Sequence, residues 1–107
     1  MADWPLSAPF TQIDVAFASS PYAIPPGANL MMTGNSDVAA DFVFDLPAAT
    51  GSGYQIIVAK GDANAHAVIA HPSGSDTING LNADVAVNDQ YDDVRLVDKA
   101  AGVWRTW

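Results

Sequence analysis

Apolar and polar residues alternate along much of the chain, and this alternation predicts short β-strands. In YQIIVAK, residues 54–60, the side chains of Tyr54, Ile56 and Val58 would share one face, because successive side chains of a strand point to opposite sides. Glycine, proline, asparagine and aspartate interrupt the alternating runs at a spacing of roughly ten residues, which predicts about eight short strands and no convincing helix. The predicted strands cover residues 10–17, 29–33, 41–46, 54–60, 65–71, 77–78, 84–87, 91–98 and 103–107.

This pattern predicts an all-β fold, namely a small antiparallel β-sandwich or jelly-roll-like domain, with a small barrel as the alternative. The N-terminal third differs from the rest, because residues 18–28 contain several prolines that interrupt regular structure. We therefore expect residues 1–36 to form an extended N-terminal arm with peripheral strands, and residues 37–107 to form the β-sandwich. The segment GDAN, residues 61–64, is predicted to be the turn of a hairpin.

Composition and charge narrow the range of partners. The 107 residues suffice for one domain, half of them are apolar, and there is no cysteine for disulfides or thiolate metal sites. The formal net charge is −8, and all 12 acidic residues are aspartates. Such a surface repels phosphate backbones and anionic lipids, which argues against nucleic acid and membranes as partners.

The segment HPSGSDTING, residues 71–80, carries the side chains most suggestive of catalysis. Ser73 or Ser75 with His71 would be a nucleophile and its base. Residues two to four apart on a turn rarely aim at one point, however, and the G-x-S-x-G motif is missing. A turn explains the same sequence, because proline presets φ and Gly74 can adopt a positive φ. We therefore expect a turn here, no catalytic residues, and a protein that is not an enzyme.

Metal and cofactor binding are not indicated either. Asp62, Asn64 and His66 resemble the start of a calcium-binding loop, but the glycine and the glutamate that should follow are missing. His66 and His71 are five positions apart in the sequence. Because this offset is odd, the two side chains would lie on opposite faces of a strand. We expect a solvated turn at residues 61–64, with no bound metal and no cofactor.

Large aromatic side chains fall mostly at inward-facing strand positions, so core packing accounts for most of them. Trp104 and Trp107 would lie on opposite faces of the last strand, and one of them is expected in the core. The other is a candidate for an interface, where large aromatic residues are enriched. The residues predicted at this interface are Trp4, Pro5, Phe10, Tyr22, Ile24, Pro25 and Trp107.

Residues 46–107 contain an ordered series of turn and strand motifs. The strand end LP (46–47) is followed by the glycine-rich turn and aromatic residue GSGY (51–54), then by DTING (76–80) and finally by GVW (102–104). This series resembles a β-domain of tailed-phage virion proteins. The family includes capsid decoration (cement) proteins and the tips of tail fibres and tail spikes.

The resemblance implies a structural domain that works as a homotrimer and has no active site. Because the chain is short, it resembles a stand-alone decoration protein more than the end of a long fibre. The expected partners are therefore other copies of the chain and the major capsid protein, at the outer surface of a phage head in the virion. The alternative is a tail-fibre or tail-spike tip module that binds a host receptor or a glycan.

Overall fold

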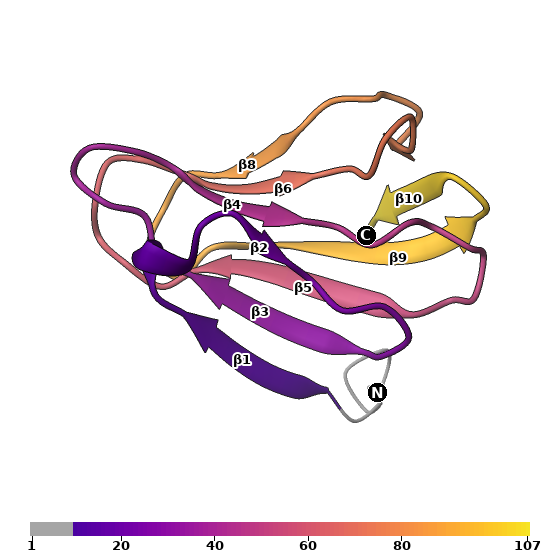
Figure 1. Cartoon of the computed structure of the whole chain (residues 1–107), viewed down its shortest axis with the longest axis horizontal. Helices are drawn as coiled ribbons and strands as arrows, with labels where there is room; N and C mark the ends of the chain where they lie inside the picture. Colours follow the sequence, from indigo (N-terminus) through magenta and orange to yellow (C-terminus); the bar gives the residue numbers. More distant parts are fainter. Residues whose placement is uncertain (1–9) are drawn as a thin grey trace.

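The computed structural model describes residues 10–107 and has an all-β chain arranged in two sheets (Figure 1). The strands of the six-stranded sheet are, in spatial order, β1 (Thr11–Val15), β3 (Leu30–Gly34), β5 (Gln55–Lys60), β9 (Asp93–Ala100), β10 (Val103–Thr106) and β7 (Thr77–Ile78). Those of the four-stranded sheet are β2 (Tyr22–Ala23), β4 (Phe42–Asp45), β6 (Val68–His71) and β8 (Val85–Val87). A short 3-10 helix, η1 (Phe17–Ser19), follows β1. The all-β prediction is confirmed, and within residues 10–107 no helix is long and apolar enough to cross a membrane.

Successive strands from β1 to β9 alternate between the two sheets. The chain therefore returns to each sheet in the same direction, and β1 with β3, β3 with β5, β2 with β4, and β4 with β6 all pair in parallel. β7 and β10 are also parallel, whereas β5 with β9, β9 with β10, and β6 with β8 are antiparallel. Both sheets are mixed, so the prediction of an antiparallel fold is wrong.

The segment at residues 61–64 illustrates the physical reason for this error. The strand before it, β5, belongs to the six-stranded sheet, and the strand after it, β6, belongs to the four-stranded sheet. GDAN therefore carries the chain from one sheet to the other and does not close a hairpin. Alternation along a strand indicates which face is buried, but it does not indicate which strand lies alongside.

The hydrophobic core lies between the two sheets. Met32 and Val58 lie side by side on the inner face of the six-stranded sheet, and Phe42 and Phe44 face them from β4. The sheets approach closely at Gly34, where an added Cβ would lie 2.8 Å from Cε2 of Phe44. Trp104 also belongs to this core, as expected for one of the two C-terminal tryptophans.

The N-terminal part of the described chain is built into the sheets. β3 lies between β1 and β5, and its Met32 is fully buried. In the proline-rich stretch, where no strand was predicted, β2 pairs with β4, and the amide of Ile24 donates to the carbonyl of Asp45 at 2.9 Å. The two sheets therefore continue across the boundary expected at residue 36. Residues 1–9 of the expected arm lie outside the described part.

Candidate functional site

Two sets of loops close the two ends of the molecule. Because β1, β3 and β5 are parallel, they all finish at one end, which Figure 1 shows at the left. We call this the lysine end; its loops are residues 35–41, 61–67 and 88–92. The opposite end is the pocket end, and its loops include residues 24–29 and 46–54.

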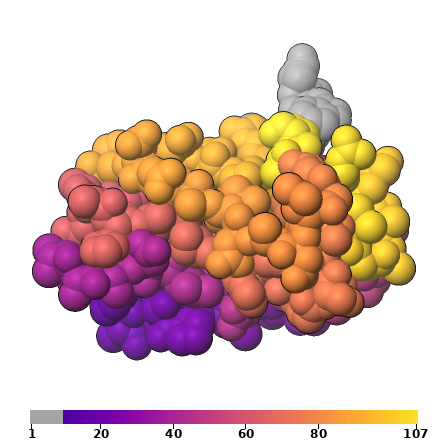
Figure 2. Space-filling view, turned by 90° about the horizontal axis from the view of Figure 1, so that it is seen from above, coloured from indigo at the N-terminus to yellow at the C-terminus, as the bar shows by residue number. Residues whose placement is uncertain are grey.

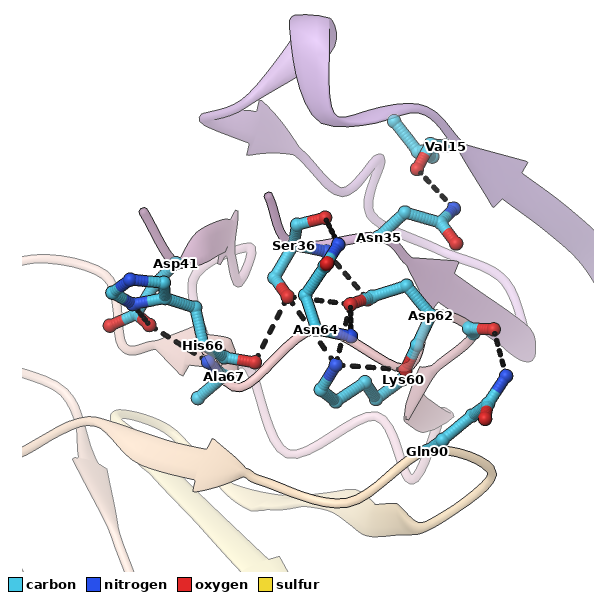
Figure 3. A network of polar contacts seen from close by, with 11 residues as sticks. Val15, Asn35, Ser36, Asp41, Lys60, Asp62, Asn64, His66, Ala67 and Gln90 are labelled. Atoms are coloured by element: carbon cyan, nitrogen blue, oxygen red, sulfur yellow. Dashed lines mark hydrogen bonds and ion pairs between the residues drawn. The ribbon is translucent and has the colours of Figure 1, made fainter. Parts of the chain in front are cut away.

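The lysine end is built around a buried cation. Lys60 follows Ile56 and Val58 on the inner face of β5, and none of its side chain is exposed. Its Nζ donates to Oδ2 of Asp62 at 2.6 Å, to the carbonyl of Asp62 at 2.9 Å and to Oγ of Ser36 at 3.3 Å (Figure 3). The ammonium group is thus enclosed by protein acceptors.

Asp62 is the anion of this network. Its carboxylate also accepts hydrogen bonds from the amide and the hydroxyl of Ser36, both at 2.7 Å, and from the amide of Asn64 at 2.9 Å. Burial raises the pKa of Asp62, but the hydrogen bonds from Lys60, Ser36 and Asn64 outweigh it and bring the pKa well below its usual range. Asp62 is therefore ionised and supplies the negative charge of the pair with Lys60.

The lysine network, formed by Lys60, Asp62, Ser36 and Asn64, joins two loops through side chains. Asn64 Nδ2 donates to the carbonyl of Ser36 at 3.0 Å. Oγ of Ser36 lies 2.9 Å from the carbonyl of His66, which therefore shares the single hydroxyl proton with Asp62. The third loop is joined by main-chain contact, since the amide of Tyr91 donates to the carbonyl of Lys60 at 2.8 Å. These contacts hold the loops in place.

The segment that resembles the start of a calcium loop does not aim its side chains at one point. Asp62 faces Lys60 and Asn64 faces Ser36, whereas Nδ1 of His66 lies 3.1 Å from Oδ1 of Asp41. Across residues 10–107, no group of three or more ionisable side chains is placed to hold a metal ion.

Residues 72–76 form the turn that connects β6 and β7, and it is held by hydrogen bonds. Gly74 has a φ of +52°, and Nδ2 of Asn82 donates to the carbonyl of Gly74 at 3.0 Å. Nδ1 of His71 lies 2.6 Å from Oδ1 of Asp84, and both side chains are about half exposed. Within residues 10–107, no hydrogen bond connects His71 to the hydroxyl of Ser73.

At the pocket end the carboxylate of Asp98 accepts most of the side-chain hydrogen bonds of the loop of residues 46–54, and Oδ2 of Asp76 accepts one more, from the amide of Ala49 at 2.9 Å. Asp98 is buried, and its Oδ1 accepts from the amides of Thr50 at 2.9 Å and Gly51 at 2.6 Å. Its Oδ2 accepts from the hydroxyl of Thr50 at 3.0 Å. Burial raises the pKa of Asp98, but the hydrogen bonds from Thr50, Gly51 and Ser52 lower the pKa by more than burial raises it. The net shift of the pKa is therefore downward. Asp98 is therefore an anion whose oxygens are already occupied.

An apolar pocket of about 170 Å³ lies beside this loop. Its walls include three prolines, the ring of Tyr54 and the indole of Trp104. Trp104 is only 1% exposed, and its Nε1–H has no hydrogen-bond partner among the described residues. The three prolines are Pro25, Pro26 and Pro47.

Two residues predicted at an interface are already in contact within the chain. Ile24 is 3% exposed and packs in the core, because pairing of β2 with β4 turns it inward. Its assignment to an interface is therefore wrong. Tyr22 is half-buried, and its ring packs edge-on against Phe44 with centroids 6.1 Å apart.

The other predicted interface residues have different settings. Phe10 is half-buried just before β1, Pro25 is exposed on the pocket wall, and Trp107 is 37% exposed at the C-terminus. Trp4 and Pro5 lie outside the described residues. The interface role of these five residues stays a prediction.

Sequence reasoning missed both buried ionisable groups. Lys60 follows Ile56 and Val58 at every second position of the strand, so its side chain points to the same inward face. Extending that face by two residues would have placed Lys60 in the core. Asp98 continues the face of Val94 and Leu96 in the same way. Its partners Thr50 and Gly51 gave no such signal, because they are far from it in the sequence.

Comparisons with known proteins identified no relative of this chain. No family model matches the sequence, and searches of curated proteins and of solved structures found no match. Arguments about function therefore rest on the chain itself.

Proposed function

We propose that this chain is a viral structural protein that decorates the outside of a phage head as a homotrimer and stabilises the shell. The motif series of residues 46–107 supports this proposal through its resemblance to the virion β-domain. In this proposal the two sheets form a sandwich-like unit. Its partners are sister copies and the major capsid protein.

The observation that carries the proposal is the set of open sheet edges. In the described part of the chain, β1 and β7 end one sheet, and β2 and β8 end the other, each with a neighbour on one side only. Edge strands present main-chain donors and acceptors that can pair with another chain. In Figure 2 the N-terminal part of the described chain (indigo) lies at the bottom of the view and the C-terminal part (yellow) at the right. The edge strands β1 and β7 end the six-stranded sheet on opposite sides, so that one copy could contact two others.

The loop contacts support a mechanical role. Asp62 and Asp98 direct their oxygens to loop amides and hydroxyls, where a catalytic carboxylate would keep them available to a substrate. A domain whose loops are held in this way changes shape little on binding. That property suits a protein that reinforces a shell.

Sedimentation equilibrium of the full chain tests the trimer, and co-sedimentation with purified phage heads tests capsid binding. Gln12→Lys on β1 and Ala86→Lys on β8 place a charge on an edge strand, and Ala18→Lys places the same charge on η1. We expect at least one edge variant to weaken trimer formation tenfold or more, and Ala18→Lys to leave it unchanged. A wild-type chain that stays monomeric and ignores heads would overturn the proposal.

The tail-tip alternative makes a different prediction. A receptor-binding module should give reproducible hits on a glycan array, whereas a decoration protein should give none. Hits together with a failure to bind heads would favour the alternative.

A further inference from the structure

The basic residues of this acidic protein are gathered on two neighbouring strands. The chain has four lysines and arginines against 12 acidic residues, for a formal net charge of −8. Lys60 is buried in the lysine network, and the other three, Arg95, Lys99 and Arg105, lie on β9 and β10. Every lysine or arginine outside the lysine network therefore belongs to this part of the six-stranded sheet.

Strand pairing brings the two arginines close together on the outer face of that sheet. Both alternate with buried residues, which turns their side chains away from the core. Arg105 pairs with Val97, and Arg95 lies two positions before Val97, so the arginines are diagonal neighbours across the two strands. Lys99 is exposed two positions beyond Val97. Among the described residues, the carboxylate beside this group is that of Asp93, whose Oδ1 lies 3.5 Å from Nε of Arg95.

A shallow hollow lies beside Arg105 at the edge of the sheet. It has a volume of about 390 Å³ and is lined by Asn79, Gly80, Val103 and Arg105. Since β7 pairs with β10 and has no second neighbour in the described sheet, a molecule packed against this edge can reach the hollow. We call the hollow, together with Arg95 and the exposed lysine of β9, the basic face. Its chemistry suits a partner that carries an aromatic ring next to carboxylates.

The loop of residues 88–92, at the lysine end, has that chemistry. Asp89 and Asp92 are exposed, and Tyr91 between them is 81% exposed. Tyr91 has a φ of +68°, in the left-handed region that bulky residues rarely adopt. Its amide donates to the carbonyl of Lys60 at 2.8 Å, and the amide of Asp92 donates to the carbonyl of Asp89 at 3.1 Å. The main chain is therefore held in place while the ring projects into solvent.

We propose that the loop of residues 88–92 of one copy docks on the basic face of a second copy, with the ring of Tyr91 in the hollow beside Arg105 and the loop carboxylates close to the other two cations. This inference rests on the proposed homotrimer. Figure 1 shows the loop between β8 and β9 at the left and β10 at the right, so the two surfaces lie toward opposite ends of one chain. Such a contact is head-to-tail, and it closes a ring when the rotation between copies matches the three-fold axis.

The first test removes the ring from the loop of the full chain. Tyr91→Asn suits the backbone, because asparagine tolerates a positive φ better than tyrosine, so circular dichroism should show an unchanged fold. Sedimentation equilibrium should show association weakened about tenfold or more, as for an aromatic residue at the centre of an interface. The matched control is Val38→Asn, because Val38 is 80% exposed at the same end, and its loss should leave association unchanged.

The second test changes the other surface. Arg105→Glu reverses the charge beside the hollow and should weaken association at least as much as Tyr91→Asn. Ala18→Glu places the same side chain at an exposed position on η1 and should leave association unchanged.

Mixing the two variants tests the head-to-tail geometry directly. Arg105→Glu keeps an intact loop and Tyr91→Asn keeps an intact basic face, so each mixed pair retains one working contact. At a concentration where each variant alone is monomeric, the equimolar mixture should form a dimer that grows no further. A mixture that stays monomeric where wild type associates would overturn the inference.

Three further outcomes separate this inference from the proposed function. A wild-type trimer that either variant leaves intact overturns the inference and leaves the trimer standing. A wild-type chain that forms open head-to-tail polymers, and loses them in both variants, upholds the contact and overturns the trimer. A wild-type monomer overturns both.

Discussion

At the lysine end a buried ion pair and its hydrogen bonds join the loops, whereas at the pocket end the carboxylates of Asp98 and Asp76 hold one loop beside a cavity. Lys60 and Asp62 leave no donor of their network unpaired, and Gly34 next to them has no room for a methyl group. The pocket end has about 170 Å³ of space and an unpaired donor on Trp104 among the described residues. The two ends therefore differ in what they can still bind.

This difference suggests a division of roles. A closed network gains nothing from a partner, because its polar groups already have acceptors and its packing is complete. The apolar pocket leaves space that an added apolar group can fill. Changes in the lysine network should accordingly reduce the stability of the folded chain, whereas changes at an exposed position of the pocket wall such as Ala48 should reduce it little.

The largest effect is expected from Asp62→Ala. The substitution leaves the ammonium of Lys60 buried without its carboxylate, and breaking such a pair typically costs about 3–5 kcal/mol. Urea denaturation followed by circular dichroism measures the free energy of unfolding. The control is Asp89→Ala, an exposed aspartate at the same end, for which a change within about 0.5 kcal/mol is expected.

The double variant Lys60→Met/Asp62→Ala tests the cause of that loss. It removes the charge together with its partner, so it should be more stable than Asp62→Ala. If the double variant is equally unstable, the unpaired charge of Lys60 is not the source of the effect.

Asp98→Ala is the matching change at the pocket end, with an expected loss of about 2–3 kcal/mol, because the amides of Thr50 and Gly51 lose their acceptor. The loss should be smaller than for Asp62→Ala because the loop can turn these amides to water. Asp98→Asn keeps one acceptor oxygen and should lie between Asp98→Ala and wild type. Amide exchange at Gly51 provides the local measurement, and equal exchange in Asn and Ala variants would contradict this account.

The two carboxylates also predict how stability depends on pH. The pKa values of Asp62 and Asp98 are lowered in the folded state, so each contributes stability that is present above the unfolded-state pKa of about 3.9 and is lost as pH falls through the folded value. Unfolding measured from neutral to strongly acidic pH should therefore show a decline that begins near pH 4. Asp98→Asn should decline less steeply than wild type, and an identical slope would show that Asp98 does not contribute.

The fold could be predicted from the sequence only as far as local patterns reach. The alternation of apolar and polar residues predicts most of the strands, among them β5, because each strand's own sequence shows which of its faces is buried. The turn at residues 72–76 follows from its proline and glycine. Strand partners were not found, because the pairing of β3 with β5 depends on loops that cross between the sheets and have no distinctive sequence.

The candidate sites follow the same division. Parity alone places Lys60 in the core, but its neighbour Ser36 comes from a distant loop, and nothing in the local sequence indicates that contact. The pocket likewise combines residues 25–28, Pro47 and Trp104, which only the folded chain brings together. Contacts between distant segments require the topology before they can be inferred.

Gly34→Ala tests how tightly the sheets pack next to the lysine end. An added Cβ would lie 2.8 Å from Cε2 of Phe44 and 3.1 Å from Cγ1 of Val68, and such overpacking typically costs about 1–3 kcal/mol. We expect the lower half of that range, since the ring of Phe44 can shift. Ala48→Val at the pocket wall is the comparison and should change the free energy of unfolding by less than about 0.5 kcal/mol. Equal losses from the two variants would remove the contrast in packing.

The smallest effect is expected for Asp84→Asn, which removes the charge of the pair with His71. Although the two side chains approach to 2.6 Å, both are about half exposed, and water screens the interaction. Exposed pairs of this kind contribute about 0–1 kcal/mol, so a change of at most about 1 kcal/mol is expected near neutral pH. Urea denaturation of Asp84→Asn beside Asp62→Ala makes the comparison direct. A loss as large as that of Asp62→Ala would mean that contact distance, and not burial, determines the strength of the charge pairs in this domain.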